Sequence, residues 1–239
     1  MRNHSACLFL TLYLLVYIFV GFTYGQNSKE NGTRTIYLIR HGYYDEKDER
    51  GSEVGKELTP LGIAQARLVA VRLKSMQINF NSLMSSTFTR ARQTAMVINE
   101  DFPELQLIQS PLISECTPPT WKKEIMTEAD SMELYNCVEN LEMAYKEIFI
   151  PSPDKDDRND IVVCHGNVIR FFVTKVLMVD PMSWLQMSIG NCSLTIVRIF
   201  PDGQMKLDTF SDTGHIPPNM QTKTGGNNDS KELIVPVNK

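Results

Sequence analysis

Hydrophobic and polar positions along the chain form short blocks that predict strands and helices in alternation. Apolar runs rich in branched and aromatic residues predict the strands. They cover residues 35–39, 82–86 and 161–164, a short piece near Leu107, and a closing hairpin at 193–200 and 205–210. Apolar residues spaced by three and four positions predict the intervening helices. These cover about residues 59–73, 89–100, 134–148 and 168–179.

This alternation predicts an α/β fold: a three-layer α/β/α sandwich with a mostly parallel central sheet. The run IVVC at 161–164 is apolar at every position, as is typical of a parallel strand covered on both faces. In open sheets of this kind, ligands bind beyond the carboxyl ends of the strands. Polar residues just past residues 39 and 164 are therefore the first candidates for a site.

The first 25 residues have a different pattern from the rest. An unbroken apolar run extends from Leu8 to Val20, and Gly25 lies a few residues further on. The pattern indicates a signal peptide cleaved after Gly25 or, alternatively, an uncleaved membrane anchor. In both cases residues 8–22 direct the chain to a membrane. The remaining divisions are a polar spacer at 26–34, the globular domain at 35–218, and a polar tail at 219–239 that we expect to be disordered.

Charge and cysteine content narrow the function classes. The 239-residue chain has a net charge of -4 and a pI near 5.6, so no basic field predicts a nucleic-acid partner. Four cysteines follow the leader, none in C-x-x-C spacing, so we expect no zinc or other metal, and no cofactor. In an oxidising compartment Cys116 and Cys137 are a candidate disulfide, although the sequence leaves the connectivity open.

Two predicted strands end alike, in IYLIRHG and IVVCHGN. Each places a histidine, His41 or His165, directly after the last apolar residues and before a glycine. A single histidine at a strand end is usually satisfied by nearby backbone. Because two histidines share this position, we interpret them as parts of one site.

A third motif, SSTFTRARQTA, places Arg90 and Arg92 at the start of a predicted helix. Cations at a helix N-terminus oppose the helix dipole and do not stabilise the helix. They are useful there when an anion lies nearby and also meets the helix amides. We predict this role for Arg90, whereas a solvated surface position explains Arg92 equally well.

These residues resemble a known family. In this order and spacing, LIRHG, SSTFTRARQTA and VVCHGNVIR resemble the motifs of the histidine phosphatase (phosphoglycerate-mutase-like) superfamily, over about residues 35–218. LTPLGIAQA, CHGNVIR and SDTGHIPP resemble more narrowly its branch of mitochondrial serine/threonine protein phosphatases. The resemblance implies a metal-independent phosphomonoester hydrolase that acts on phosphoprotein or on a small phosphomonoester.

The resemblance also implies a role for each site residue. His41 would attack phosphorus and become phosphohistidine, while Arg40, Arg90 and His165 bind the phosphoryl oxygens. Glu115, in LISE after the third strand, would protonate the leaving oxygen and then activate water. The chemistry agrees with these roles. Imidazole is largely neutral and nucleophilic near pH 7, and guanidinium forks hold phosphate oxygens in place of a metal.

Some positions depart from the family's common pattern. Tyr44 stands where many members carry a small polar residue, which favours a rim for a larger substrate. Gly166 follows His165 where the acid-phosphatase branch has aspartate, so that branch's acid does not transfer. Residues 26–34 do not resemble the Trp/Asp-rich oligomerisation segment of the mitochondrial branch. The family's mode of assembly therefore does not transfer to this chain, and the sequence leaves open whether it forms a homodimer. A surface turn explains His215, in DTGHIPP, nearly as well as the mouth of the site does.

Three other functions are consistent with parts of the sequence. Cys164 and Arg170 match the C-x5-R of cysteine-dependent phosphatases, although Val168 and Ile169 between them are typical of packed helix. A mutase would share the phosphohistidine and return the phosphoryl group to its substrate. A non-catalytic module would only bind a phospho-ligand. The leader indicates a secreted, exported or single-pass anchored protein, and the family branch adds the mitochondrial membrane as an alternative.

Overall fold

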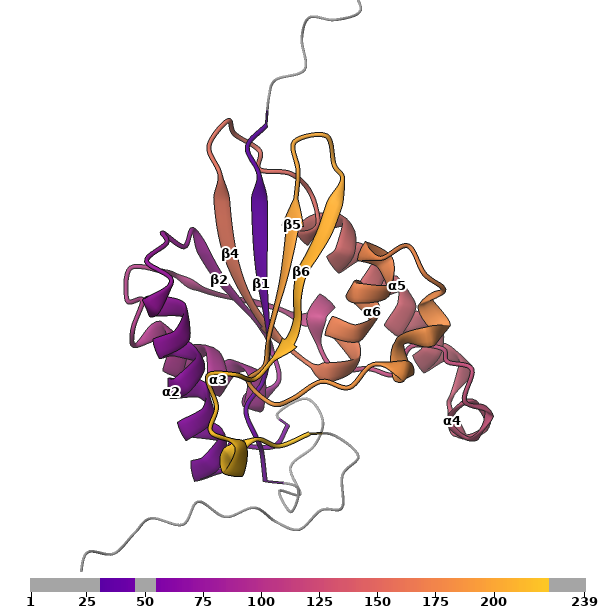
Figure 1. Ribbon diagram of the computed structural model, residues 1–239. Helices are drawn as coiled ribbons and strands as arrows, with labels where there is room; N and C mark the ends of the chain where they lie inside the picture. Colours follow the sequence, from indigo (N-terminus) through magenta and orange to yellow (C-terminus); the bar gives the residue numbers. More distant parts are fainter. Residues whose placement is uncertain (1–30, 46–54, 224–239) are drawn as a thin grey trace, which may run out of the picture.

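The computed structural model describes residues 31–45 and 55–223, in which one mixed six-stranded sheet lies between two layers of helices (Figure 1). Its strands are β1 (Arg34–Arg40), β2 (Ser82–Ser86), β3 (Leu107–Ser110), β4 (Arg158–Cys164), β5 (Leu194–Ile199) and β6 (Met205–Asp212). Their spatial order is β3-β2-β4-β1-β5-β6. The first four in this order are parallel, β5 is antiparallel to β1, and β6 is antiparallel to β5. The predicted α/β/α sandwich with a mostly parallel sheet is confirmed.

The helices are α2 (Pro60–Ser75), α3 (Thr89–Asn99), α4 (Lys123–Glu128), α5 (Ser131–Ile148) and α6 (Gly166–Val176). Helix α4 is not among the helices that the sequence pattern predicts. Helix α5 begins at Ser131 rather than at residue 134, because the Asp130 side chain accepts two backbone N–H groups of the first turn. Helix α6 begins at Gly166, two residues earlier than predicted, and ends at Val176. Its first turn is therefore next to His165.

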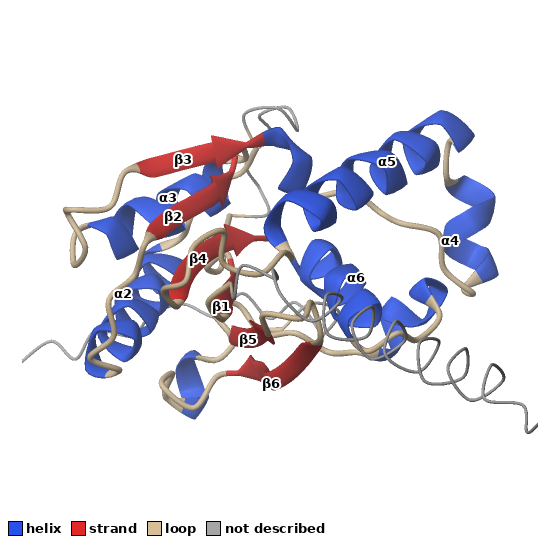
Figure 2. Cartoon of the chain, turned by 90° about the horizontal axis from the view of Figure 1, so that it is seen from above, coloured by secondary structure: helices blue, strands red, loops and turns tan. Residues whose placement is uncertain are grey.

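Alternate residues of β1 enter two separate cores. Ile36 and Leu38 pack in the cluster that holds the buried side chains of α5 and α6. Tyr37 and Ile39 pack in the cluster that holds those of α2 and α3. Figure 2 shows these helix pairs on opposite sides of the sheet. Covering both faces explains why the central strands are apolar at consecutive positions.

In helix α2 the run Thr59-Pro60-Leu61 predicts a threonine N-cap, which the structure confirms. The apolar face predicted by the spacing of Ile63, Ala66, Ala70 and Leu73 differs from the observed one. Thr59 accepts the N–H of Gly62 at 3.1 Å. Ile63, predicted to face the core, is 38% exposed, and Gln65 is fully buried instead. A Cβ atom added to Gly62 would lie 1.9 Å from the carbonyl oxygen of Tyr43, so only glycine allows this close approach. The start of α2 is thereby packed against the loop that follows β1.

The described chain continues past the predicted domain end at residue 218. Thr222 is buried, and its hydroxyl contacts both Gln65 and Asn191 at 3.0 and 2.8 Å. Residues 219–223 therefore pack against the globular fold, and the rest of the predicted tail lies outside the described residues. The predicted leader at 1–25 also lies outside them. Within the residues that are described, no helix is long and apolar enough to cross a membrane.

Candidate active site

The register between β1 and β4 places two histidines side by side. Arg40 pairs with Cys164 in the parallel ladder, and the backbone N–H of His41 donates to the carbonyl of Cys164 at 3.0 Å. His41 and His165 each directly follow their strand, and their ring centroids are 5.1 Å apart. Both therefore lie at the carboxyl edge of the sheet, where the fold class predicts a ligand site.

His41 is a buried imidazole that carries a lone pair on Nε2. Nδ1 lies 2.8 Å from the carbonyl oxygen of Gly42, which can only accept, so Nδ1 carries the proton. Nε2 then accepts a hydrogen bond from Nε of Arg90 at 3.2 Å. Burial, followed by the charges of Arg40, His165 and Arg90, holds the pKa of His41 well below its usual value of 6.5. The ring is therefore neutral and nucleophilic at physiological pH.

Arg40 supplies a buried cation beside this ring. It is 5% exposed, and one terminal nitrogen donates to the carbonyl of Ile189 at 2.9 Å. Its Nε is also buried and has no hydrogen-bond partner within the described residues. A Cβ atom on Gly166 would approach Nε to 3.3 Å, so glycine keeps the space open. Burial lowers the pKa of Arg40 to about 10, and the group remains charged at neutral pH.

Arg90 reaches the same point from the first turn of α3. Its guanidinium lies over the rings of Tyr44 and Phe88, with each centroid 5.1 Å from Cζ. Such stacking holds the planar fork in place. Phe88, the N-cap residue of α3, provides no side-chain cap, so nothing on its side chain competes for an anion at this helix end.

His165 is held by Ser86 at the end of β2. Its Nε2 lies 2.8 Å from the Ser86 hydroxyl oxygen, which already accepts the N–H of Phe88 at 3.2 Å. The hydroxyl has one proton and two lone pairs. We assign its proton to Nε2 and the ring proton to Nδ1, because Nδ1 faces the carboxylate of Glu115 at 3.7 Å. Nδ1 is buried without a hydrogen-bond partner among the described residues. Burial, then the charges of Arg90 and Arg40, lower the pKa of His165 well below 6.5.

Glu115 faces this group from the loop after β3. One carboxylate oxygen accepts the backbone N–H of Asn167 at 3.3 Å. The other lies 3.9 Å from Arg90 and 3.7 Å from Nδ1 of His165. Although 26% of the side chain is exposed, burial of the carboxyl group raises the pKa of Glu115, and Arg90 and then Arg40 oppose the rise. A raised pKa suits a carboxyl group that must donate a proton.

The cluster has the properties of an oxyanion site. Arg40 and His165 each carry a buried ring or guanidinium nitrogen without a hydrogen-bond partner among the described residues, and Arg90 contacts Nε2 of His41 at 3.2 Å. His41, Glu115 and His165 do offer donor types that could ligate zinc, with ligand atoms within 4.8 Å of one another. Two guanidiniums at the same point would repel a divalent cation, whereas they stabilise phosphate. The residues present fit a phosphoryl group better than a metal.

A cavity of about 700 Å³ opens beside the cluster. Tyr44, Arg90 and Glu115 line the end nearest the histidines. The far end reaches α5, where Glu133 and Asn140 contribute to the wall. A volume of this size exceeds what a single phosphate needs and is in the range of sites for larger ligands.

Several supporting residues were missed by sequence reasoning. Thr94 accepts the N–H of Gly42 at 3.0 Å, and Asn191 donates to the carbonyl of His41 at 3.0 Å. Ser86 and Thr94 both lie inside the quoted motif SSTFTRARQTA, which was a usable signal. Asn191 lies 150 residues from His41, and no local pattern marks it.

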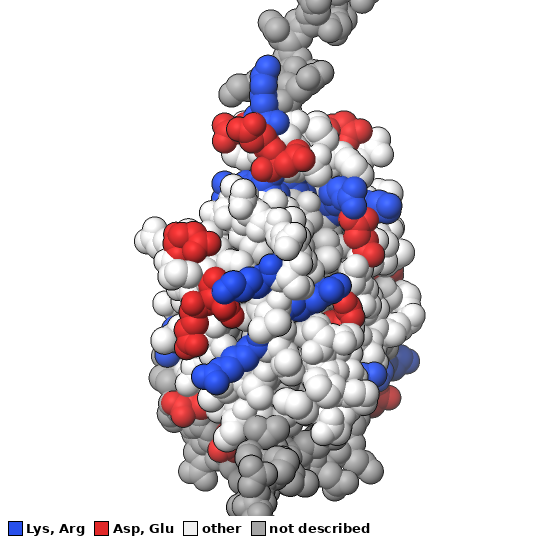
Figure 3. Space-filling model, turned by 60° about the vertical axis from the view of Figure 1, so that its left-hand side comes forward, with Lys and Arg blue, Asp and Glu red and all other residues white. Residues whose placement is uncertain are grey.

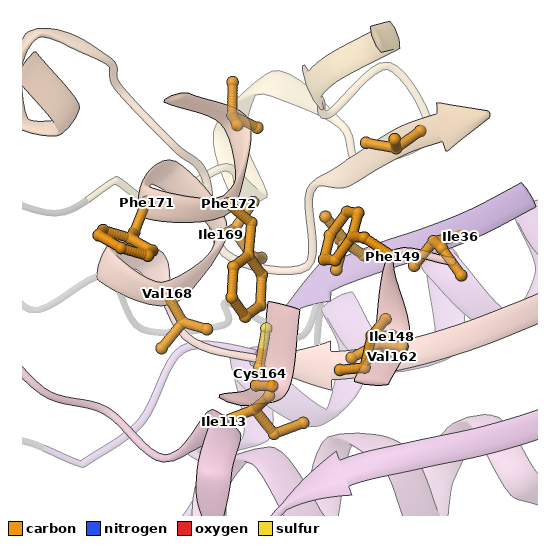
Figure 4. Packing of buried hydrophobic residues seen from close by; sticks show 14 of the residues in the cluster. Ile36, Ile113, Ile148, Phe149, Val162, Cys164, Val168, Ile169, Phe171 and Phe172 are labelled. Carbon is orange, nitrogen blue, oxygen red and sulfur yellow. The ribbon is translucent and has the colours of Figure 1, made fainter. Parts of the chain in front are cut away.

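Four other candidate residues from the sequence lie outside the cluster. Arg92 does not line the cavity. His215 donates from Nε2 to the carbonyl of Cys192 at 3.0 Å, behind the end of β1. Cys164 is fully buried among apolar side chains (Figure 4), and burial raises the pKa of its thiol far above the usual value. Arg170 donates to backbone of Gly166 and stacks on Trp184, so the C-x5-R reading is wrong.

Comparison with known proteins gives consistent results. Residues 36–146 and 150–213 match the family model of the histidine phosphatase superfamily, branch 1. A Caenorhabditis elegans protein described as a mitochondrial serine/threonine-protein phosphatase is 40% identical over 199 residues, covering 81% of this chain and 68% of its own length. The corresponding Homo sapiens protein is 34% identical over 206 residues, covering 82% and 68%.

Solved structures share the fold. A phosphoglycerate mutase from Plasmodium falciparum superposes with a TM-score of 0.54 at 27% identity, covering 75% of this chain and 91% of its own. A phosphoserine phosphatase from Entamoeba histolytica superposes with a TM-score of 0.56 at 23% identity, covering 77% and 100%. The second likeness shows the fold alone.

Proposed function

Since the chain belongs to the histidine phosphatase superfamily, we propose that it hydrolyses phosphomonoesters without a metal, through a phosphohistidine at His41. The observation that carries the proposal is the hydrogen-bonding state of this ring. Its proton is held on Nδ1 by Gly42, and its Nε2 lone pair lies among two guanidiniums and a second imidazole.

In the first half-reaction the substrate phosphate takes the place of the contact between Arg90 and His41. Arg40, Arg90 and the Nδ1–H of His165 donate to the phosphoryl oxygens, where charge is greatest in the transition state. The lone pair of His41 Nε2 forms a bond to phosphorus, and the bond from phosphorus to the ester oxygen breaks. Glu115 gives its proton to that oxygen, which leaves as an alcohol.

In the second half-reaction water replaces the alcohol. The carboxylate of Glu115 takes a proton from the water as its oxygen bonds to phosphorus, and the P–Nε2 bond breaks. Phosphate leaves, His41 is again neutral, and Glu115 is again protonated. The hydrogen bond from Nδ1 to Gly42 keeps one ring geometry throughout both steps.

Phosphoserine and phosphothreonine in proteins are the substrates that we propose. The relatives carry the description serine/threonine-protein phosphatase, and the cavity of about 700 Å³ continues along α5, well beyond one small ester. On the face that Figure 3 shows, Lys and Arg side chains alternate with Asp and Glu, without a large basic patch. A cavity lined by both polar and apolar side chains and a surface of mixed charge suit protein substrates better than nucleic acid.

A mutase activity is the second candidate, because a phosphoglycerate mutase is 27% identical over three quarters of the chain. A mutase substrate carries a second anionic group, which requires further cations. Among the described residues that line the cavity, Lys56 and Arg90 are the basic ones, and Glu133 adds a negative charge to the lining. This balance favours hydrolysis of a phosphopeptide.

Trapping the phosphoenzyme tests the proposal. Full-length protein is mixed briefly with a ³²P-phosphoserine peptide, denatured, and exposed to acid or to base. We expect a label that acid removes and base does not, as for phosphohistidine, and none in His41→Ala. A base-labile label, or labelling that survives His41→Ala, would refute the mechanism. Phosphate release compared with phosphoglycerate isomerisation separates phosphatase from mutase.

The compartment remains a separate proposal. The relatives are described as mitochondrial. The predicted leader and the disulfide between Cys116 and Cys137 favour a destination that is membrane-bound and permits disulfides. Fractionation of cells expressing a C-terminally tagged chain distinguishes mitochondria from secreted medium, and gel filtration of the product tests for a homodimer.

A further inference from the structure

Glu115, the acid of the proposed mechanism, is weakly held by its own contacts. It lies between the 3-10 turn Pro111–Ile113 and α4, in a stretch without regular structure. The carboxylate contacts to Asn167, His165 and Arg90 are 3.3, 3.7 and 3.9 Å long. Good hydrogen bonds in proteins are about 2.7–3.2 Å long, so these contacts do not fix the side chain. The backbone of the loop must set its place.

The backbone is anchored at the next residue. Cys116 is bonded to Cys137 by a disulfide with the Cα atoms 5.7 Å apart. The carbonyl of Cys116 also accepts a hydrogen bond from the Asn167 side chain at 2.9 Å. A second anchor follows at Pro119, whose carbonyl accepts from the Trp184 ring at 3.0 Å. Only the disulfide ties the immediate neighbour of Glu115 covalently to another described element.

Cys137, the other cysteine of the disulfide, is buried in a hydrophobic core cluster. Cys137 is 4% exposed on α5 and packs in the same core cluster as Leu141 and Ile148, which are also on that helix. This cluster includes residues of β1 and β4, the strands that deliver the two histidines. The disulfide therefore ties the loop that carries Glu115 to the same core that holds the strand preceding His41.

Both cysteines also line the 700 Å³ cavity, so a small dithiol can reach the bond from solvent. One thiolate of the dithiol attacks a cystine sulfur, the Cys116–Cys137 bond breaks, and the second thiol closes a disulfide on the reductant. Two electrons and two protons pass to the cysteines. The loop then keeps only its hydrogen-bonded anchors.

We propose that the Cys116–Cys137 disulfide is a positioning element for Glu115, and that its reduction selectively weakens leaving-group protonation. The inference rests on the proposed function, because it requires Glu115 to be the acid. A displacement of about 1 Å in a catalytic group can cost on the order of 100-fold in rate. We expect the phosphorylation half-reaction with a phosphoserine peptide to fall about 10- to 100-fold.

The test compares substrates that need the acid to different degrees. Rapid-quench measurements on the full chain give the rate of phosphoenzyme formation from a phosphoserine peptide and from p-nitrophenyl phosphate, whose phenolate leaves without a proton. Cys116→Ser/Cys137→Ser and the dithiol-reduced wild type should slow the peptide reaction and change the nitrophenyl reaction by less than about 3-fold. Dithiol should not affect the double variant.

Glu115→Gln provides the matched control. It should show the same dependence on the leaving group, and adding Cys116→Ser/Cys137→Ser to it should cause no further loss, because both changes act through one carboxyl group. Equal losses with both substrates, or additive losses in the combined variant, would show a general structural role and overturn the inference. A label that survives His41→Ala would instead overturn the proposed function. Urea unfolding confirms that the variants are compared while folded.

Discussion

Ser86 offers a direct measurement of how the second imidazole is oriented. Its hydroxyl is fully buried, accepts the N–H of Phe88 at 3.2 Å, and lies 2.8 Å from Nε2 of His165. This arrangement leaves the His165 proton on Nδ1, which is the nitrogen that faces Glu115. Ser86→Ala removes the donor to Nε2 without removing any group that contacts phosphate.

Ser86→Ala should lower both the free energy of unfolding and kcat/KM, and each loss can be calculated separately. A buried acceptor left without its donor costs about 1–3 kcal/mol, so we expect the free energy of unfolding to fall by about 1–2 kcal/mol. Without Ser86 the ring proton is shared between both nitrogens, and His165 is then a less reliable donor to the phosphoryl group. Loss of a complete oxyanion donor costs about 2.7–4 kcal/mol. A partial loss corresponds to about 10- to 100-fold in kcat/KM, at 1.36 kcal/mol per tenfold.

The neighbouring residue is the control for this experiment. Ser85 is also fully buried on β2, but its hydroxyl has no hydrogen-bond partner among the described residues. Ser85→Ala should therefore leave stability and kcat/KM nearly unchanged. The assay is kcat/KM for a phosphomonoester, measured per folded molecule, with urea unfolding of both variants. If Ser86→Ala is no less active than Ser85→Ala, the assigned tautomer of His165 is wrong.

Four further predictions follow from the structure. Because the pKa values of His41 and His165 are depressed, the unfolded chain binds protons first, so stability should fall as pH drops below about 6.5, and His41→Gln should reduce that slope in urea titrations. Because the pKa of Glu115 is raised and its protonated form is the acid, kcat/KM should fall as pH rises through that pKa, and a profile unchanged in Glu115→Gln would contradict the assignment. Exhaustive chelation should leave kcat within about 2-fold, since guanidiniums do the work of a metal; loss restored by zinc would favour the His41, Glu115 and His165 triad as a metal site. Cys164→Ala should keep activity within about 3-fold while lowering stability by about 1 kcal/mol, and an inactive but folded variant would revive the thiolate mechanism.

The main site residues could be proposed from sequence because their positions depend on local patterns. Apolar runs locate the strand ends at residues 40 and 164, and parallel strands in an open sheet present those ends at one edge. The helix start at Thr89 likewise locates Arg90. These inferences need only periodicity and the geometry of the fold class, and the strand ends and the helix start agree with the structure.

The residues that were missed depend on tertiary contacts. Gln65 interrupts the apolar face of α2, yet it is fully buried, because Oε1 accepts the N–H of Tyr43 and Nε2 donates to the carbonyl of Met220. An apolar periodicity count cannot recognise a buried amide that is satisfied from 155 positions away. The same count wrongly predicts that Ile63, which is exposed, faces the core. Asn191 was missed for the same reason.

Arg90 affects His41 in two ways, through a hydrogen bond to Nε2 and through its positive charge. Its Nε–H occupies the His41 lone pair when no substrate is bound, and its charge, with that of Arg40, helps keep that ring unprotonated. A phosphate dianion competes for the same N–H with two charges rather than one lone pair, so it can draw Arg90 away and expose the nucleophile. Binding of the phosphate would then also free the Nε2 lone pair of His41 for attack. In the proposed mechanism, the cations that bind the substrate also lower the pKa of His41 and so keep its ring unprotonated. Because both imidazoles are neutral, they add no positive charge to that of the two guanidiniums.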